Sequence, residues 1–483
     1  MPVSSLPSPH GIGSLGKEAY RFVDFLAAAG QRYWQILPIG PTGYGDSPYQ
    51  SFSAFASNPY FIDLDTLVQN GLLTQAEVDA ADFGTDPAHV DYYKLYKERY
   101  PLLKLAAGRF DRAQDAFADF CAANADWLPD YALFMALKAE HGMQAFSRWP
   151  AALRLRDEDT LAAARARLAD QIYFWEFLQY LFSVQWTALK AYANSRGVLL
   201  IGDIPIYVSP DSSDLWASPA LFQVDDTGAL TEVAGCPPDA FSEDGQLWGN
   251  PLYAWDVHLA TGCAWWVRRM QHAGSVYDVV RIDHFRGFES YYAIPAGDET
   301  AVNGTWRKGP GMALITTLRE KLPDVQIIAE DLGYQTDALR ALLADSGFPG
   351  MKVLQFAFDS REESDYLPHN YTHNCVVYTG THDNTTSADW ELSAPAADVA
   401  FAKRYLDLAP GEDFARKLVR AALASVADTA VIPLQDWLGL GAGARMNTPS
   451  TLGGNWLWRV SGAALTDALA QDIRRLTKLY GRL

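Results

Sequence analysis

The sequence predicts an α/β fold of the (β/α)8 TIM-barrel type with helical and loop insertions. Strand and helix patterns alternate, which indicates a parallel sheet. Acidic residues follow several strands directly, as is typical of a barrel whose site lies at the C-terminal strand ends. A doubly wound open sheet is the alternative. Eight short apolar runs are the strand candidates, and they begin at Tyr33, Phe61, Val198, Val276, Val325, Lys352, Val376 and Ala430.

Helical periodicity and turn residues divide the rest of the chain. Residues 17–29 predict a helix that ends at Gly30. Residues 66–190 show helical periodicity without strand runs, which predicts a mainly helical insertion. Residues 209–260 are rich in turn formers and predict a loop-rich insertion that includes an active-site lid. We expect residues 1–483 to form a single catalytic barrel, and the sequence indicates no oligomeric state.

The fourth strand candidate ends in ionisable residues. It reads Val279-Val280-Arg281-Ile282-Asp283-His284-Phe285. Side chains alternate along a strand, so Arg281 and Asp283 share one face. Arg281 should keep Asp283 ionised, which makes Asp283 a candidate nucleophile or metal ligand. A purely structural ion pair between these two residues is the alternative.

Two later strand candidates also end in acids, Glu330 and Asp383. On the count of eight strands, these residues and Asp283 face one mouth of the barrel. We expect the charges of Asp283 and Asp383 to raise the pKa of Glu330, which suits a general acid. Three carboxylates without a His or Cys cluster of metal-ligand spacing indicate chemistry on an acetal. A nucleophile and an acid roughly 5 Å apart would give retention of configuration.

Composition limits the classes of partner. A net charge of −19 and a pI of about 4.8 argue against nucleic acid and against an anionic membrane as partners. A neutral substrate fits better, and the many aromatic residues suit stacking on sugar rings. The four cysteines form no C-x-x-C pair, so we expect neither a zinc site nor a disulfide framework. With no recognisable signal peptide, a cytoplasmic location is predicted.

Gly11 and Gly13 belong to a G-x-G-x-x-G match that ends at Gly16. A dinucleotide-binding turn needs a preceding strand and an acid about 20 residues later, and this chain offers neither. We therefore interpret the glycines as a structural loop.

Several motifs together resemble those of the 4-α-glucanotransferases, called amylomaltases in bacteria and disproportionating enzymes in plants. The resemblance extends from about residue 9 to residue 460. The motifs that carry it are WQILPIGPTGYGDSPYQSFSAFA at 34–56, GDIPIYV at 202–208, RIDHFRGF at 281–288, AEDLG at 329–333, THDN at 381–384, ARMNTP at 444–449 and GNWLWR at 454–459.

This resemblance implies a role for each matching residue. Asp283 corresponds to the nucleophile, Glu330 to the acid/base and Asp383 to the stabiliser of the transition state. Arg281, His284 and His382 are implied to support them. The residues implied to bind glucan are Asp46, Ser47, Tyr49, Asp203, Gln246, Trp248 and Asn455, with Tyr44 near a second glucan site and Asp239 and Phe241 on the loop that covers the active site.

The resemblance also implies an activity. It predicts a retaining transferase that moves α-1,4-glucan segments between malto-oligosaccharides or starch, without a cofactor, a catalytic metal or the C-terminal β-sandwich of amylases. A retaining α-glucan hydrolase has the same three carboxylates and is the alternative; an inactive glucan-binding protein is a third hypothesis. Ser450 stands where the family pattern has glycine, so the local turn is strained if that position needs a positive φ.

The segment 236–251 is the predicted lid, with Phe241 at its tip. Three prolines stiffen its ends, two glycines let it turn, and its aromatic residues give it an apolar underside. Such a lid would keep water from the glycosyl-enzyme and favour transfer over hydrolysis. The alternative is that the aromatic residues pack the loop onto the barrel.

Overall fold

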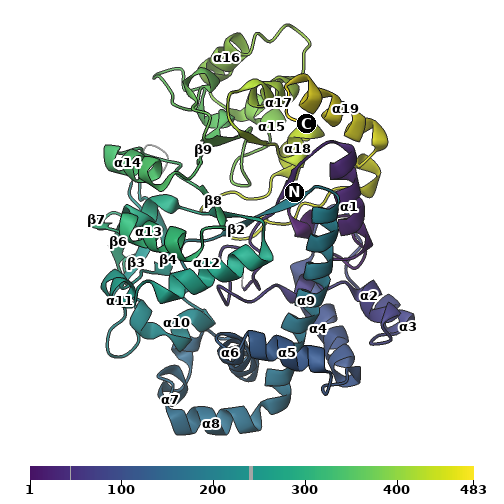
Figure 1. Ribbon diagram of the computed structural model, residues 1–483, viewed down its shortest axis with the longest axis vertical. Helices are drawn as coiled ribbons and strands as arrows, with labels where there is room; N and C mark the ends of the chain where they lie inside the picture. Colours follow the sequence, from purple (N-terminus) through teal and green to yellow (C-terminus); the bar gives the residue numbers. More distant parts are fainter. Residues whose placement is uncertain (44, 239–242) are drawn as a thin grey trace.

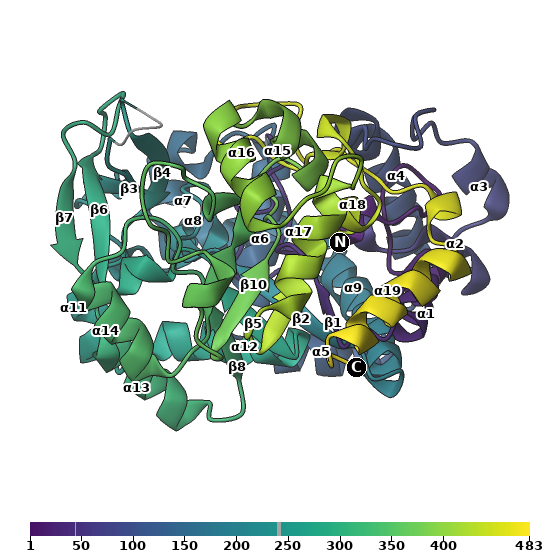
Figure 2. The same cartoon turned by 90° about the horizontal axis from the view of Figure 1, so that it is seen from above.

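The computed structural model describes residues 1–43, 45–238 and 243–483. Seven parallel strands lie at the centre of the molecule (Figures 1 and 2). Seven of the eight predicted strands are confirmed at nearly the predicted positions. They are β1 (Tyr33–Gln35), β2 (Leu199–Ile204), β5 (Val279–Ile282), β8 (Gln326–Ala329), β9 (Gly350–Val353), β10 (Cys375–Tyr378) and β11 (Thr429–Val431).

The strands form two hydrogen-bonded groups that follow one another around a common axis. The first has the order β1-β2-β5-β8 and the second the order β9-β10-β11, and every pair is parallel. The Ala329 N–H donates to the Pro349 carbonyl at 3.0 Å and connects β8 to the segment that enters β9. Parallel registers pair Asp203 with Arg281 and Ile282 with Ala329, which places the ends of β2, β5 and β8 side by side.

One apolar cluster fills the space that the strands enclose. It combines buried side chains of β2, β5, β8, β9 and β10, including Ile201, Val279 and Ile328. Tyr33 of β1 and Val431 of β11, the two end strands, pack against the same cluster. An open sheet cannot bring both of its end strands onto one cluster, so the sheet is curved into a barrel and the doubly wound alternative is wrong.

In the described part of the chain, β1 and β11 are not paired with each other. A cavity of about 520 Å³ lies between them and is also lined by helices α1 (Lys17–Ala28) and α19 (Asp467–Leu479). The Met1 ammonium donates to the carbonyl of Gln35 at this edge of β1, at 3.2 Å. The Tyr378 hydroxyl reaches across the barrel to the Gln35 side chain at 2.9 Å. These edge strands are half-buried, whereas β5 and β10 are buried throughout.

The strand predicted at Phe61 is wrong, because local capping favours helical turns there. Pro59–Phe61 forms a 3-10 turn in which the Asn58 side chain accepts from the Tyr60 N–H. Asp63 then caps helix α2 (Leu64–Gln69) by accepting from the Thr66 N–H. Pro59 has no N–H of its own and suits the first position of a helical turn better than a central strand.

The segment predicted as a helical insertion consists of helices in the structure, and Figure 1 shows α7 and α8 at one end of the molecule, opposite α16 (Ala396–Tyr405). The longest helix, α9, packs against α6 and leads back into β2. After α2, the helices of this segment are α3 (Gln75–Asp79), α4 (Tyr92–Arg109), α5 (Asp115–Ala123), α6 (Leu128–Glu140), α7 (Ala151–Arg154), α8 (Glu158–Arg167) and α9 (Ala169–Ser195).

The segment predicted as a loop-rich insertion contains regular structure that the sequence reading missed. It holds helices α10 (Ser213–Ala217) and α11 (Trp255–Ala260) and strands β3 (Glu232–Cys236) and β4 (Gln246–Pro251). These strands form an antiparallel sheet of order β4-β3-β6-β7 with β6 (Ser290–Pro295) and β7 (Thr305–Lys308). Figure 2 shows this second sheet on one side of the barrel.

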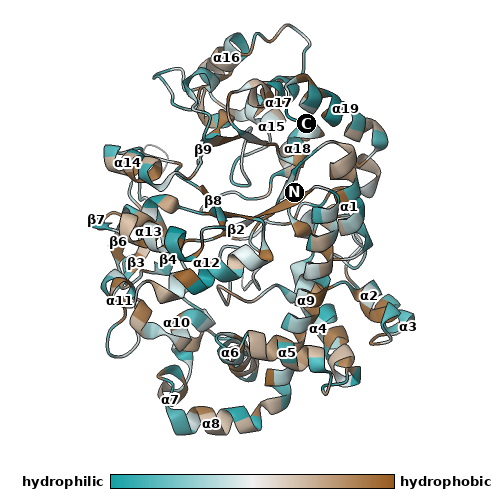
Figure 3. Cartoon of the chain, in the orientation of Figure 1, coloured by the Kyte–Doolittle hydropathy of each residue, from teal (hydrophilic) through white to brown (hydrophobic). Residues whose placement is uncertain are grey.

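Helices surround the barrel on the remaining sides. Figure 3 shows hydrophobic colouring on the central strands and hydrophilic colouring on the outward face of α19. Among the described residues, β11 is the last strand, and no helix is long and apolar enough to cross a membrane. The other helices are α12 (Ala264–Val276), α13 (Met312–Lys321), α14 (Asp337–Ser346), α15 (Ser387–Ser393), α17 (Phe414–Ala424) and α18 (Leu434–Trp437).

Candidate active site

A buried ion-pair network lies where β2 and β5 end. Arg281 Nη1 lies 2.7 and 2.6 Å from the two carboxylate oxygens of Asp203, and both side chains are almost fully buried. The same nitrogen donates to Asp283 Oδ1 at 3.1 Å. The register that pairs Asp203 with Arg281 produces the first contact, and strand alternation produces the second. The predicted proximity of Arg281 and Asp283 is therefore confirmed.

The pKa of Asp283 is set by opposing causes. Burial raises it, Arg281 lowers it, and Asp203 and Asp383 raise it, with a result of about 6. The expectation that Arg281 keeps Asp283 ionised therefore holds near neutral pH but not in acid, because burial outweighs the cation. Burial alone would lower the pKa of Arg281, but the charges of Asp203 and Asp283 hold it well above its usual value.

Glu330 follows β8 and is held by backbone donors. Its two oxygens accept from the His284 N–H at 2.7 Å and from the Leu332 N–H at 2.8 Å. Burial is the main cause that raises its pKa to about 8, and the charge of Asp283 adds to it. We predicted a raised pKa from Asp283 and Asp383 together. The direction is confirmed, but the larger cause is desolvation and Asp383 is not among the causes.

Aromatic and amide side chains line the side of the mouth next to β5. The Trp248 ring meets the His284 ring edge-on, with centroids 4.8 Å apart. Gln246 accepts from the Trp248 indole N–H at 3.0 Å, and β4 presents both residues. Burial lowers the pKa of His284 to about 4, so this ring is neutral at pH 7. A neutral imidazole suits a hydroxyl partner and not a cationic acid.

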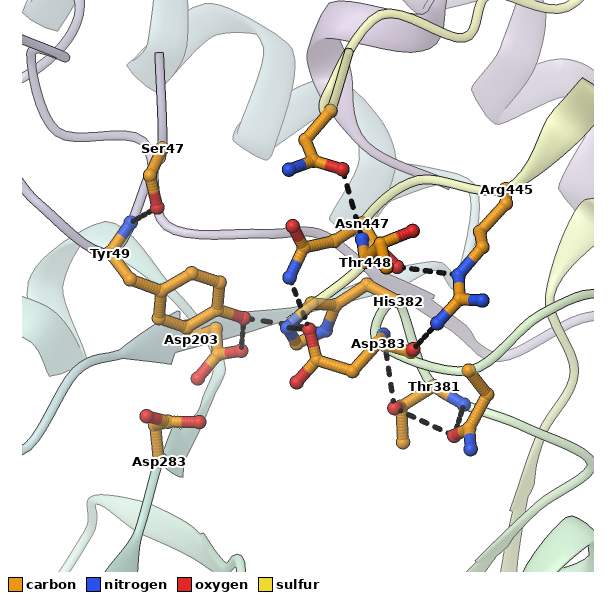
Figure 4. Close-up of polar contacts among 12 residues, drawn as sticks. Ser47, Tyr49, Asp203, Asp283, Thr381, His382, Asp383, Arg445, Asn447 and Thr448 are labelled. Atoms are coloured by element: carbon orange, nitrogen blue, oxygen red, sulfur yellow. Dashed lines mark hydrogen bonds and ion pairs between the residues drawn. The ribbon is translucent and has the colours of Figure 1, made fainter. Parts of the chain in front are cut away.

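Asp383 lies on the opposite side of the mouth, beyond β10 (Figure 4). Tyr49 connects it with the buried network: its hydroxyl donates to Asp203 at 2.8 Å and lies 3.4 Å from His382 Nδ1. The Tyr49 and His382 rings stack with centroids 4.9 Å apart. The other imidazole nitrogen, Nε2, is 3.4 Å from Asp383 Oδ1. The fold thus brings residues near 49, 203, 283 and 383 into one site.

A segment that the sequence reading assigned no role contacts Asp383. The Asn447 amide donates to Asp383 Oδ1 at 2.6 Å, and Arg445 donates to the Asp383 carbonyl at 2.7 Å. Both residues lie in the conspicuous motif at 444–449. The motif was the sequence signal for Arg445 and Asn447, but its spacing does not indicate that they contact Asp383.

The remaining predicted site residues stand apart from these contacts. Ser47 accepts from the Tyr49 N–H at 3.3 Å and so supports the tyrosine. Asn455 accepts from the Thr448 N–H at 2.9 Å and so supports the loop that contains Asn447. Asp46 lines a small cavity that contains none of the three carboxylates, and burial raises its pKa to about 6. Tyr44, Asp239 and Phe241, and with them the predicted lid tip, lie outside the described residues.

Ser450 adopts the conformation that the family pattern predicts for glycine. Its φ is +61°, in the left-handed region that non-glycine residues rarely occupy. Away from residues 44 and 239–242, no group of three or more His, Cys, Asp or Glu residues could hold a metal ion.

Comparison with known proteins identifies the family of this chain. A family model described as 4-alpha-glucanotransferase matches residues 1–466. A 4-alpha-glucanotransferase of Clostridium butyricum is 47% identical over 485 residues, which cover all of both chains. One from Thermus thermophilus is 48% identical over 492 residues and covers 99% of this chain and 97% of the relative.

A solved structure confirms the fold. Amylomaltase from Streptococcus agalactiae, in complex with acarbose, is 43% identical with a TM-score of 0.97, covering 100% of this chain and 98% of that one. This match supports the predicted (β/α)8 barrel class. By sequence and by structure, the chain belongs to the 4-alpha-glucanotransferase family.

Proposed function

We propose that this chain transfers α-1,4-glucan segments by a double displacement, with Asp283 as nucleophile, Glu330 as acid and base, and Asp383 as stabiliser of the transition state. The observation that carries the proposal is the pair of carboxyls at the ends of β5 and β8. The pKa of Asp283 is about 6 and that of Glu330 about 8, so near pH 7 the first is mainly ionised and the second mainly protonated. Two carboxyls with separated pKa values are what acid-assisted attack on an acetal requires.

In the first step, a carboxylate oxygen of Asp283 attacks the anomeric carbon of the donor glucan. The glycosidic C–O bond breaks, and its electron pair goes to the leaving oxygen. Glu330 donates its proton to that oxygen. In the second step, Glu330 takes the proton of an acceptor hydroxyl, whose oxygen attacks the anomeric carbon. The ester bond breaks and the Asp283 carboxylate is restored, with two inversions that give net retention.

The substrate assignment rests on the relatives and on the chemistry of the mouth. The similar proteins are named 4-alpha-glucanotransferases, and the similar amylomaltase structure holds acarbose. In this chain, Trp248 and Tyr49 offer ring faces, and the neutral His284 can pair with a hydroxyl. The residues proposed to bind glucan are those that the family resemblance implies. A cytoplasmic location remains a prediction.

Incubation with maltotriose tests the proposal. Transfer yields glucose and a ladder of longer malto-oligosaccharides. Hydrolysis yields glucose and maltose without the ladder, and that result would favour the α-glucan hydrolase. A protein that only binds glucan yields neither. Asp283→Asn serves as the inactive control. In the wild-type enzyme, mass spectrometry of a trapped glycosyl-enzyme should locate the sugar on Asp283 and on no other residue.

The role of Glu330 has its own test. Glu330→Gln should cut the first step by several orders of magnitude with starch, because the leaving oxygen receives no proton. A glucosyl fluoride needs no protonation of its leaving group, so its cleavage should suffer far less. Equal losses with both substrates would show that Glu330 is not the acid.

A further inference from the structure

The segment 445–448 holds the turn that carries Asp383. The Asn447 N–H donates to the His382 carbonyl at 3.1 Å, and Arg445 Nη2 donates to the Asp383 carbonyl at 2.7 Å. Arg445 Nε also donates to the Asn447 carbonyl at 2.7 Å, which ties the segment to itself. Figure 4 shows the two Arg445 contacts on one side of Asp383, facing away from Asp283.

Asn447 also reaches the carboxylate itself. Its side-chain nitrogen lies 2.6 Å from Asp383 Oδ1, the shortest polar contact that Asp383 makes in the described part of the chain. The Asp383 side chain is 47% exposed and follows a strand end, so packing does not fix its rotamer. The turn below it is rigid by comparison, because Asn384 Oδ1 accepts from both the N–H and the hydroxyl of Thr381.

We propose that Asn447 is a positioning residue that fixes the orientation of the Asp383 carboxylate for the transfer reaction. This inference rests on the proposed role of Asp383 as stabiliser of the transition state. A group that stabilises developing positive charge must be oriented before the charge develops, since reorientation during the reaction lowers its benefit. A hydrogen bond to an ionised acceptor is about twice as strong as a neutral one and leaves the second carboxylate oxygen available for substrate.

The first test removes the hydrogen bond without adding charge. Asn447→Ala keeps the backbone bond to His382 but frees the carboxylate, so kcat should fall about tenfold or more. KM should change much less, because orientation of Asp383 matters mainly in the transition state. Asn447→Gln, which retains the amide on a longer side chain, should recover part of kcat. A residue that merely supported the loop would instead lower the melting temperature and leave kcat of the folded enzyme unchanged.

The second test adds charge at the same place. Asn447→Asp is nearly isosteric and puts a second carboxyl 2.6 Å from Asp383 Oδ1. Two carboxyls this close share a proton, so the pair should add its own ionisation to the acid limb set by Asp283 and move that limb up by about one pH unit or more. The other ionisable groups facing Asp383 in the described part of the chain are His382 at its carboxylate, Arg445 at its carbonyl, Tyr49 beside His382 and Asp283 across the mouth. These groups are the same in both variants, so only the new carboxyl distinguishes Asn447→Asp from Asn447→Ala.

Controls separate this inference from the function on which it rests. Asn374→Asp makes the same change of charge at an exposed position before β10 and should leave the acid limb in place. Asp383→Asn should lower transfer strongly; if it does not, the role of Asp383 itself is wrong. If Asp383→Asn is inactive while Asn447→Asp keeps the wild-type acid limb and Asn447→Ala keeps the wild-type kcat, then Asn447 does not position Asp383.

Discussion

Replacing Glu330 by glutamine should stabilise the protein in alkaline solution and destabilise it in acid. Burial and Asp283 raise the pKa of Glu330 from 4.5 to about 8 in the folded state. A carboxyl whose pKa is higher in the folded than in the unfolded state stabilises the fold in its protonated form. Its contribution is fully present below about pH 4.5 and is lost as the pH rises through about 8. Glutamine does not titrate and does not lose this contribution.

The magnitude follows from that pKa and from the hydrogen bonds of Glu330. The change from 4.5 to about 8 corresponds to roughly 5 kcal/mol of folding free energy lost over this pH range. Glutamine has one acceptor oxygen, so it cannot serve both the His284 and the Leu332 N–H groups. The lost bond costs about 1–3 kcal/mol at every pH. Above about pH 8 the variant should therefore be more stable by about 2–4 kcal/mol.

Chemical unfolding of wild type and Glu330→Gln across this pH range measures the difference. The two stability curves should cross, with the variant lower in acid and higher in base. Glu362→Gln, an equivalent change at an exposed side chain, should follow the wild type within about 0.5 kcal/mol. Curves for wild type and Glu330→Gln that run parallel would refute the raised pKa, and with it the assignment of Glu330 as a protonated acid at neutral pH.

Three other predictions follow from the same contacts. Asp203→Asn should lower the free energy of unfolding by about 3 kcal/mol because it breaks a buried ion pair. Tyr49→Phe removes only the hydroxyl that donates to Asp203 and should lower it by about 1 kcal/mol. Equal losses for the two variants in denaturant titrations would contradict the charge argument. The plot of kcat/KM against pH should be bell-shaped with limbs near 6 and 8, and a flat profile between about pH 5 and 9 would exclude the assigned roles. Amide hydrogens of β1 and β11, each of which pairs with one strand in the described part of the chain, should exchange faster than those of β5 and β10. Equal protection by mass spectrometry would show that the other edges of β1 and β11 are covered.

The elements that could be predicted are those whose pattern repeats locally. Val279 to Ile282 and Cys375 to Tyr378 are short apolar runs followed by acids, and a parallel barrel gathers such strand ends at one mouth. The eighth strand, at Phe61, failed because an apolar run of this length also fits a capped helical turn, and Asn58 and Asp63 decide between them. Periodicity alone cannot separate the two.

The parts that could not be predicted depend on partners distant in the chain. The antiparallel sheet joins β3 and β4 to β6 and β7, about 60 residues later, and β7 is exposed throughout, so no apolar alternation marks it. Asn447 reaches Asp383 over 64 residues through a loop that contains Ser450 in the left-handed region. The main cause of the raised pKa of Glu330 was missed for the same reason, because it is burial in the folded barrel.

The different roles proposed for Asp283 and Glu330 follow from the position of one cation, the guanidinium of Arg281. Both carboxyls come directly after neighbouring strands in the register that pairs Ile282 with Ala329. Two residues before Asp283, on the same strand face, is Arg281; two residues before Glu330 is the buried, apolar Ile328. Arg281 is the main influence that lowers the pKa of Asp283, and the charge of Asp283 in turn raises the pKa of Glu330. The proposed nucleophile is therefore the carboxyl on the strand with the arginine, and the proposed acid is the carboxyl on the strand without it.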